Sequence, residues 1–270
     1  MENAPDPFQG LEGLTTAIRD EPDGWALFLD IDGTLIDLAD TPDAIIVPPA
    51  LPGHLNAISE RLGGALALVT GRALPYADRL FQPYRFPIAG LHGSERRAAD
   101  GTIQRLAATA AFNEVKQSLQ AASGEWPGVL IEDKGAAIAA HYRQAPEWRD
   151  TVEKAMEFYL SQAGTDFTLQ RGKMVFEIRP ARADKGEAVR AYLDEPPFRG
   201  RCPITIGDDI TDEAMFRAAN SLGGRSIRIS ETAGGTEACT TIASTSLLRE
   251  TLSRLATHPD TPENPKGSTA

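Results

Sequence analysis

Trp-Ala-Leu-Phe-Leu-Asp-Ile-Asp-Gly-Thr-Leu, residues 25–35, is the stretch that decides the fold. Its first five residues form a short, continuous apolar run, which predicts a strand buried on both faces at the centre of a parallel sheet. Asp30 and Asp32 stand at the carboxyl end of this strand, and Gly33 and Thr34 follow at once. Ligands of open α/β sheets bind just outside the carboxyl ends of the strands. The stretch therefore predicts a binding site as well as a core strand.

The two carboxylates of this stretch are costly to pack side by side unless a positive group lies between them. Mg²⁺ suits such a place, because it takes oxygen ligands and bridges to the phosphate of a substrate. We interpret Asp30 as a nucleophile that attacks phosphorus. Asp32 would protonate the leaving oxygen and then activate water. The alternative is a solvated turn after a buried strand, since Asp and Gly are ordinary turn residues.

Composition restricts the partners of this chain. At 270 residues it can form one large or two modest domains, and its net charge is −11. We therefore expect no nucleic acid or membrane partner, and an anionic substrate would need a local positive site. The first residues do not resemble a signal peptide, so we expect a cytoplasmic protein. We also expect the protein to be a monomer or a weak oligomer. Cys202 and Cys239 are expected to be buried thiols, with a disulfide or a catalytic cysteine as alternatives.

Two types of pattern divide the chain. Strands and helices alternate in residues 21–106 and 181–256, which predicts an α/β core with a Rossmann-like parallel sheet. Residues 107–180 contain two helix-like stretches and four short strands, typical of an inserted α+β unit with an antiparallel sheet. We expect residues 1–20 to be a polar lead-in with a short helix. Residues 257–270, rich in Pro, Thr, Asn and Gly, are expected to be a disordered tail.

Other candidate site residues stand where predicted elements end or begin. Thr70 and Gly71 follow one predicted strand, Asp208 and Asp209 follow another, and Lys185 lies near the start of a predicted helix. In a parallel sheet these ends meet on one edge. The Thr70 hydroxyl could bind a phosphoryl oxygen, Gly71 would let the backbone approach it, and Lys185 could neutralise the phosphoryl group and the nucleophile together.

The acidic run after residue 207 could complete a metal site. Asp208 would be a ligand of Mg²⁺, with Asp209 and Asp212 as further ligands or as side chains that hold the ligands in place. Each candidate also has a structural explanation: Thr-Gly-Arg is a common loop triplet, a lysine on a helix is usually solvated, and acidic residues favour a helix start. Their joint occurrence in this order is hard to explain structurally.

In chain order, Asp-x-Asp-Gly-Thr, Thr-Gly-Arg, Lys and Gly-Asp-Asp-x-Thr-Asp resemble the four motifs of the haloacid dehalogenase superfamily, over residues 25 to about 230. The resemblance implies that superfamily's fold, with Asp30 as nucleophile and Asp32 as acid and base. It also implies Mg²⁺ held by Asp30, the main-chain carbonyl of Asp32 and Asp208. An insertion between the Thr70 and Lys185 motifs resembles the larger cap class, in which the cap covers the site and binds the leaving group.

Alternation along the strands of the insertion gives each strand a polar and an apolar side. The polar sides carry paired hydrogen-bonding groups: Glu132 with Lys134, His141 with Arg143, and Lys173 with Glu177. Such groups suit a hydroxyl-rich ligand. Without the phosphatase motifs, a sheet face that simply meets water would be the better interpretation. The apolar sides are expected to pack on the two helices of the insertion.

Three cap stretches resemble motifs of the trehalose-6-phosphate phosphatase family: Glu132-x-Lys134, His141-Tyr-Arg143 and Gly172-Lys173-x-x-x-Glu177-x-Arg-Pro. The stretch Gly90-Leu-His92-Gly93-Ser-Glu95 is similar to that family too. The resemblance implies that the sugar hydroxyls are bound by Glu132, Lys134, Arg143, Lys173 and Glu177. We also expect substrate contacts from Gly71, Arg72, His92, His141 and Asp212.

The expected activity is therefore the Mg²⁺-dependent hydrolysis of trehalose 6-phosphate to trehalose and phosphate through an aspartyl-phosphate. One alternative is a phosphatase for another sugar phosphate, such as sucrose 6-phosphate or mannosyl-3-phosphoglycerate. A second alternative, from a different functional class, is a catalytically silent sugar-phosphate sensor. All four catalytic positions are filled, so the sequence gives no reason to prefer the sensor.

Overall fold

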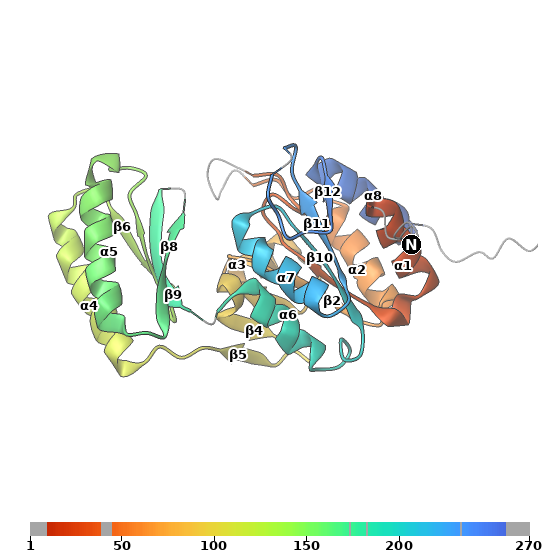
Figure 1. Ribbon diagram of the computed structural model, residues 1–270, viewed down its shortest axis with the longest axis horizontal. Coiled ribbons are helices and arrows are strands. Elements are labelled where there is room, and N and C mark those ends of the chain that lie inside the picture. Colours follow the sequence, from red (N-terminus) through yellow and green to blue (C-terminus); the bar gives the residue numbers. More distant parts are fainter. Residues whose placement is uncertain (1–9, 39–44, 173, 182, 233, 258–270) are drawn as a thin grey trace, which may run out of the picture.

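The computed structural model describes residues 10–38, 45–172, 174–181, 183–232 and 234–257, and it contains two sheets (Figure 1). The larger sheet has eight strands in the order β12-β11-β10-β1-β2-β3-β4-β5. Six of its strands are parallel: β1 (Trp25–Leu29), β2 (Leu66–Val69), β3 (Ile88–Gly90), β10 (Cys202–Gly207), β11 (Arg225–Ile229) and β12 (Thr240–Ile242). The α/β class and the parallel core sheet predicted from the sequence are confirmed.

Helices cover both faces of this sheet, as parallel sheets require. The helices α1 (Gly10–Asp20) and α2 (Leu51–Arg61) both contact α8 (Thr245–Thr257), and α6 (Lys185–Leu193) packs on α7 (Glu213–Ser221) (Figure 1). A shorter helix, α3 (Leu74–Leu80), follows β2. None of the helices in the described residues combines the length and the apolar character needed to span a membrane. The tail predicted for residues 257–270 lies outside the described residues, except that Thr257 is the last residue of α8.

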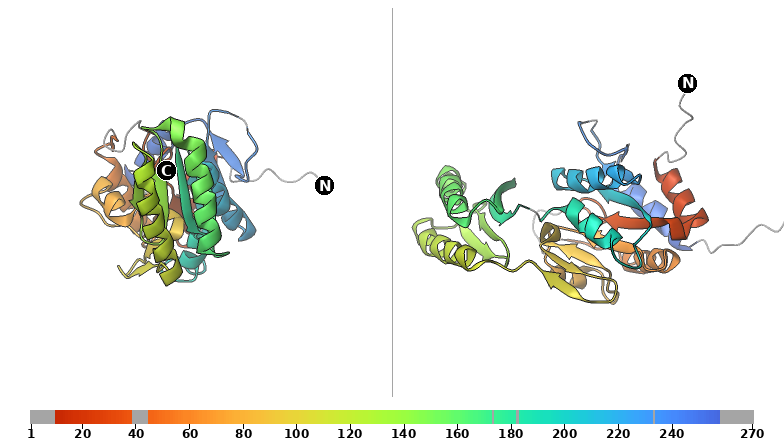
Figure 2. Two further views of the ribbon diagram at one scale, coloured as in Figure 1. Left: turned by 90° about the vertical axis from the view of Figure 1, so that its left-hand side faces the viewer. Right: turned by 60° about the horizontal axis from the view of Figure 1, so that its bottom comes forward.

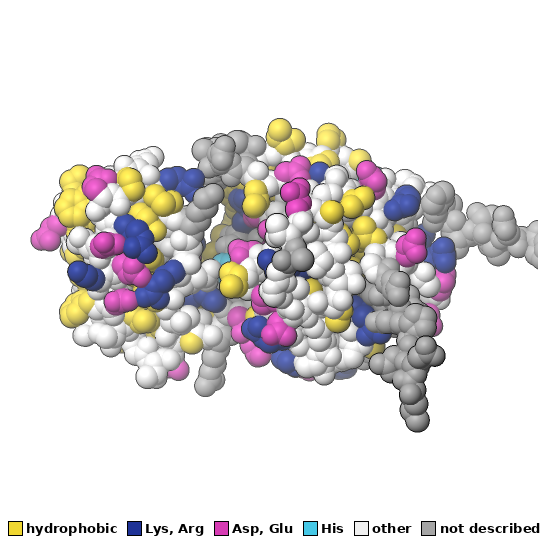
Figure 3. All heavy atoms as spheres, turned by 45° about the horizontal axis from the view of Figure 1, so that its top comes forward, with side chains coloured by type: hydrophobic (Ala, Val, Ile, Leu, Met, Phe, Trp, Pro, Cys, Tyr) yellow, Lys and Arg dark blue, Asp and Glu magenta, His cyan; other side chains and the backbone are white. Residues whose placement is uncertain are grey.

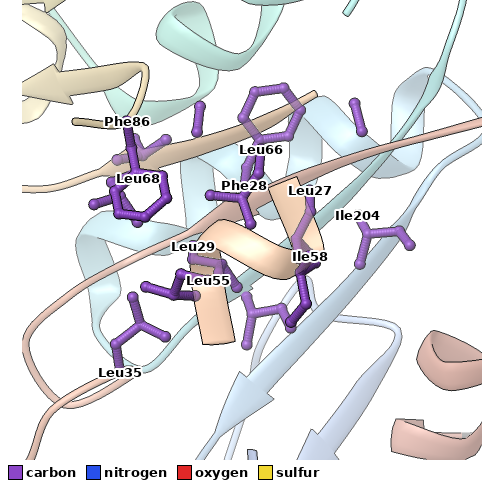
Figure 4. Packing of buried hydrophobic residues seen from close by; sticks show 14 of the residues in the cluster. Leu27, Phe28, Leu29, Leu35, Leu55, Ile58, Leu66, Leu68, Phe86 and Ile204 are labelled. Atoms are coloured by element: carbon purple, nitrogen blue, oxygen red, sulfur yellow. The ribbon is translucent and has the colours of Figure 1, made fainter. Parts of the chain in front are cut away.

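The strand β1 is the centre of the core, between β10 and β2. Its side chains from residue 26 to 29 have no exposed surface, so the prediction of a strand buried on both faces is confirmed. Figure 4 shows Leu27 and Leu29 beside Leu55 and Ile58 of α2. The ring of Phe28 lies 5.5 Å from that of Phe198 and 6.0 Å from that of Tyr192. This packing holds the carboxyl end of β1 in place.

The inserted segment forms a second unit, in which one sheet packs on two helices around its own hydrophobic core. It consists of α4 (Ala110–Ala122), β6 (Leu130–Asp133), β7 (Ile138–His141), α5 (Arg149–Ala163), β8 (Phe167–Gly172) and β9 (Val175–Pro180). The antiparallel sheet has the order β6-β7-β9-β8, and its apolar face packs on α4 and α5 through residues such as Phe112, Met156 and Phe176. Because this unit has its own core, we propose that residues 107–180 form the cap domain. Figure 2 shows the two chain segments that join it to the rest.

Three features differ from the sequence-based expectation. The core sheet continues into an antiparallel hairpin of β4 (Glu95–Arg97) and β5 (Ile103–Arg105), and β12 adds a further short strand. The expectation of buried thiols was wrong: Cys202 is half-buried at the start of β10, and Cys239 is exposed just before β12. Both cysteines are free. Both cysteines lie where a strand begins, and the buried part of β10 starts only after Cys202.

Replacement of Phe28 by Ala should lower the free energy of unfolding by about 3–5 kcal/mol, because it leaves a cavity next to Phe198 and Tyr192 at a fully buried site. Denaturant unfolding followed by circular dichroism measures the change. The control is Phe158→Ala on α5, where the side chain is 59% exposed and a change within about 0.5 kcal/mol is expected. Equal losses in the two variants would contradict this description of the core.

Candidate active site

A buried ion pair joins the end of β1 to the start of α6. The Nζ of Lys185 lies 2.8 Å from Oδ1 of Asp30 and 2.6 Å from Oδ1 of Asp212. Asp184 caps the helix by accepting from the backbone N–H of Glu187, which makes Lys185 the first helical residue. Lys185 and Asp30 are both buried, with 2% and 4% of their residue surface exposed. The fold thus brings together two predicted catalytic residues that are 155 positions apart.

The turn after β10 places Asp208 and Asp212 beside this pair. Oδ2 of Asp212 accepts from the backbone N–H groups of Asp208 at 2.9 Å and Asp209 at 3.0 Å, which closes a short turn at Ile210–Asp212. The hydroxyl of Thr34 donates to Oδ1 of Asp208 at 3.3 Å. Asp208 comes so close to the loop after β1 that only a glycine fits at position 33. Gly33 has φ +77°, and a Cβ there would lie 2.2 Å from Oδ2 of Asp208.

The two other acidic residues of this turn differ in position. Asp209 is exposed, and its side chain accepts from the N–H of Ile210, so it stands outside the carboxylate cluster that could hold a metal. Asp212 has no exposed surface and bonds to Lys185 and to the turn, which fits the predicted alternative of a side chain that holds the ligands in place. The reason for the difference is the direction of the turn, which points Asp212 inward and Asp209 outward. Metal binding by Asp209 and substrate contact by Asp212 stay predictions from the sequence.

The cluster carries an excess of negative charge. One oxygen of each of Asp30, Asp208 and Asp212 lies within 4.8 Å of the others. Burial raises the pKa of Asp30 well above its ordinary value, against the pull of Lys185. Burial, followed by the charge of Asp212, raises the pKa of Asp208 to about 6. Burial opposes the charge of Lys185, but the carboxylates of Asp30 and Asp212 hold its pKa above the ordinary value.

A divalent cation fits this donor set. Three carboxylates and one ammonium leave two negative charges, which such a cation would balance, and carboxylate oxygen is the ligand that hard cations prefer. Both oxygens of Asp212 already accept hydrogen bonds, so Asp30 and Asp208 are the better-placed ligands.

The carboxylate of Asp32 is paired with Arg72. Nε of Arg72 lies 2.5 Å from Oδ2 of Asp32, and Nη2 of Arg72 lies 2.5 Å from Oδ1, a bidentate contact. The guanidinium also lies over the ring of Tyr76, 4.4 Å from its centre. Thr70 is fully buried, and its hydroxyl oxygen accepts from the N–H of Arg72 at 3.1 Å. Arg72, expected from the sequence to bind substrate, thus holds the predicted acid and base in this structure.

His92 lies between this edge and the cap. It has φ +57°, an uncommon conformation for a residue other than glycine, and its ring packs so closely on Gly71 that a Cβ there would be 2.8 Å from Cε1. Burial, then the charges of Lys185, Arg179 and Lys134, lower the pKa of His92 to about 3. The ring is therefore neutral at physiological pH. Its buried Nδ1 has no hydrogen-bond partner among the described residues.

The polar face of the cap sheet carries a network of paired charges. Nζ of Lys134 lies 2.7 Å from Oε2 of Glu177 and 4.0 Å from Oε2 of Glu132. Nε2 of His141 lies 2.9 Å from the same Glu132 oxygen, and this bond is the main cause of the lowered pKa of Glu132. Arg143 is exposed in the turn that follows β7, beyond the strand predicted to contain it.

Two adjoining cavities connect the core edge with this face. One, of about 470 Å³, is lined by Asp30, Asp32, Gly71, His92, Lys185 and Asp208 among others. The second, of about 510 Å³, is lined by Gly71, Arg72 and Tyr76 from the core and by Glu132 and Lys134 from the cap. Figure 3 shows the hollow between the two units. The predicted residue Lys173 lies outside the described residues.

Arg228 and Arg179 are candidate residues that the sequence did not single out as site residues. Arg228 lines the 470 Å³ cavity. Arg179, near the end of β9, contributes to the low pKa of His92 and donates to the carbonyl of Ala183. Because Arg179 stands two positions after Glu177, alternation along the strand puts both on one face, and this was the available signal.

Comparisons with known proteins agree on one family. The family described as trehalose-phosphatase matches residues 28–249. A probable trehalose-phosphate phosphatase of Sinorhizobium fredii is 58% identical over 91% of this chain and 92% of its own length. The trehalose-6-phosphate phosphatase of Escherichia coli K12 is 40% identical over 76% and 77% of the two chains. The solved C-terminal domain of a C. albicans trehalose-6-phosphate phosphatase is 22% identical, with a TM-score of 0.75 over 92% of this chain and 97% of that one, which shows the fold.

The variant Gly33→Ala should lower the affinity for divalent cations by about tenfold or more, because its Cβ would push the Asp208 carboxylate out of the cluster. Calorimetric titration of the purified chain measures the affinity. Gly101→Ala is the matched control: Gly101 also has a positive φ, +86°, but a Cβ there has no atom within 4 Å. Both variants carry similar backbone strain, about 1–2 kcal/mol. The same cation affinity in both would show that Asp208 is not held as described.

Proposed function

Because this chain belongs to the trehalose-phosphatase family, we propose that it hydrolyses trehalose 6-phosphate to trehalose and phosphate. The observation that carries the proposal is the position of Asp30, bonded to Lys185 at the carboxyl end of β1 and facing a cavity that continues to the polar face of the cap. If the phosphate group of the substrate binds at Asp30, its sugar lies on the side of the cap.

In the first half of the proposed reaction, a carboxylate oxygen of Asp30 attacks phosphorus, and the bond from phosphorus to the sugar oxygen breaks. Asp32 gives its proton to that oxygen, and trehalose leaves. In the second half, Asp32 takes a proton from water, which attacks the aspartyl-phosphate and releases phosphate. Because Arg72 occupies both oxygens of Asp32, Asp32 must exchange this contact for the sugar oxygen in each cycle.

The groups around the phosphoryl site supply its positive charge. Lys185 stabilises the charge on the phosphoryl oxygens and holds Asp30 in its attacking position. We propose Mg²⁺ as the cation, held by Asp30 and Asp208, where it would neutralise charge that develops on the phosphoryl group. Gly71 and His92 line the cavity beside it, and the neutral ring of His92 can offer a hydrogen bond to the phosphate ester without competing for charge. Thr70 is fully buried next to Gly71, and the contact of its hydroxyl with the phosphoryl group stays a prediction from the sequence.

The cap would select the leaving group. Its face presents acceptors at Glu132 and Glu177 and donors at Lys134 and His141, which suit the many hydroxyls of a disaccharide. Arg143 and Lys173 stay candidates from the sequence for the same role. A ligand that displaces these ion pairs without offering matching hydroxyls would leave half-buried charges unpaired, so the face discriminates against it. The cytoplasmic location and the monomeric or weakly oligomeric state stay predictions from the sequence.

Asp30→Asn should lower phosphate release from trehalose 6-phosphate by about a thousandfold or more, because the amide is a poor nucleophile. The circular dichroism spectrum should not change. Phosphate release in the presence of Mg²⁺ measures the effect, with Asp100→Asn in the exposed turn between β4 and β5 as control. A variant with normal turnover would rule out Asp30 as the nucleophile.

Glu177→Gln should lower kcat/KM for trehalose 6-phosphate by about tenfold or more and change that for p-nitrophenyl phosphate less than about twofold, because the aryl ester makes no use of the cap face. The control is Glu157→Gln, whose carboxylate pairs with Arg171 away from the cleft. Equal losses on both esters would mean that the cap does not bind sugar. A panel with sucrose 6-phosphate tests the choice of disaccharide.

A further inference from the structure

The fourth strand of the cap sheet carries a polar side chain that points to the same face as the charged network. Gln170 of β8 stands directly opposite Glu177 of β9, which stands opposite Ala139 of β7, which stands opposite Glu132 of β6. Residues paired in this way lie on one face of a sheet. Glu132, Ala139, Glu177 and Gln170 therefore form one row across all four strands, about 14 Å wide at the usual strand spacing of about 4.8 Å.

The neighbours of Gln170 along β8 confirm this orientation. Phe167 and Leu169 pack in the cap core, on the opposite face. Arg171 likewise turns to the helix side, where it bonds to Glu153 and Glu157 of α5. Gln170 alternates with these residues and so faces the cleft side of the sheet, between the cap helices and the core (Figure 1).

Gln170 is left unsatisfied in this position. Its Oε1 is buried, yet it has no hydrogen-bond partner among the described residues. On the same face, Nε of Arg179 is also buried without a partner among them. Most buried polar atoms in folded proteins are paired, so an acceptor and a donor left open on one face indicate a place where a ligand or water completes the bonding. By contrast, the Lys134 and Glu177 charges of this face are paired with each other.

We propose that Gln170 is a specificity-determining residue that accepts a hydrogen bond from a hydroxyl of the sugar leaving group. This inference rests on the proposed phosphatase function. Ala139, between Glu132 and Glu177, adds no polar group to the row, and Gln170 extends the row beyond Glu177. A row of this width can reach the second ring of a disaccharide, which the charged groups on the first three strands would not cover alone. A carboxamide adds an acceptor there without a further charge.

The test uses the full chain with Mg²⁺ and the variant Gln170→Met, which keeps the length of the side chain and removes its polar atoms. KM for trehalose 6-phosphate should rise about three- to tenfold, with kcat within about twofold of the wild-type value. The inhibition constant of trehalose as a competitive inhibitor should rise by the same factor. Kinetics on p-nitrophenyl phosphate should not change. The matched control is Gln162→Met, on the exposed outer helix of the cap, with no expected effect.

The outcomes separate this inference from the function on which it rests. A wild-type chain that releases no phosphate from trehalose 6-phosphate would overturn both. An active Gln170→Met enzyme with unchanged KM, or with equal losses on both esters, would overturn the role of Gln170 alone. If Gln170→Met folds poorly, Gln170→Asn serves instead: it keeps the amide but withdraws it from the face, and the same rise in KM is expected.

Discussion

The ammonium group of Lys185 lies between the buried carboxylates of Asp30 and Asp212, and the rest of the site depends on this contact. A buried charge without a partner costs several kcal/mol, so neither carboxylate could be so deeply buried alone. The partners come from both halves of the core, before and after the cap. The site therefore exists only when β1, β10 and α6 have assembled. Lys185 follows the end of β9 at Pro180 by only five positions, so the cap sheet and the ion pair are close neighbours in the sequence.

The same contact leaves part of the negative charge at the site unbalanced. Lys185 balances only one of three neighbouring carboxylates, and burial raises the pKa of both Asp30 and Asp208. A protonated Asp30 would be a poor nucleophile, so a further positive charge is needed to keep it ionised. Asp212 contributes by fixing Lys185 and the turn that carries Asp208, which is a structural role for a residue with no exposed surface.

The sequence predicted the parts of the site that follow from strand ends and helix starts. Asp30, Lys185 and Asp208 could be placed because apolar runs and a capping pattern mark those ends clearly. The roles of Asp209 and Asp212 could not, because spacing does not say which side chain of a tight turn points inward. The β4–β5 hairpin was missed for a related reason. Arg96 and Arg97 are buried there through ion pairs with Glu195 and Asp78, so the segment lacks the apolar alternation of a strand.

Paired charges also stand where a substrate would bind, and this affects selectivity. Arg72 pairs with Asp32 at the core edge, and Lys134 pairs with Glu177 on the cap. A ligand that breaks such a pair must bond both of its partners, because a partner left without a bond would be a half-buried, unpaired charge. On the proposed function, a phosphate ester alone would satisfy the core edge but not the cap, and a free sugar would satisfy only the cap. A sugar phosphate of the right length would replace both sets of contacts at once, so the two ion pairs together would favour the complete substrate over either half of it.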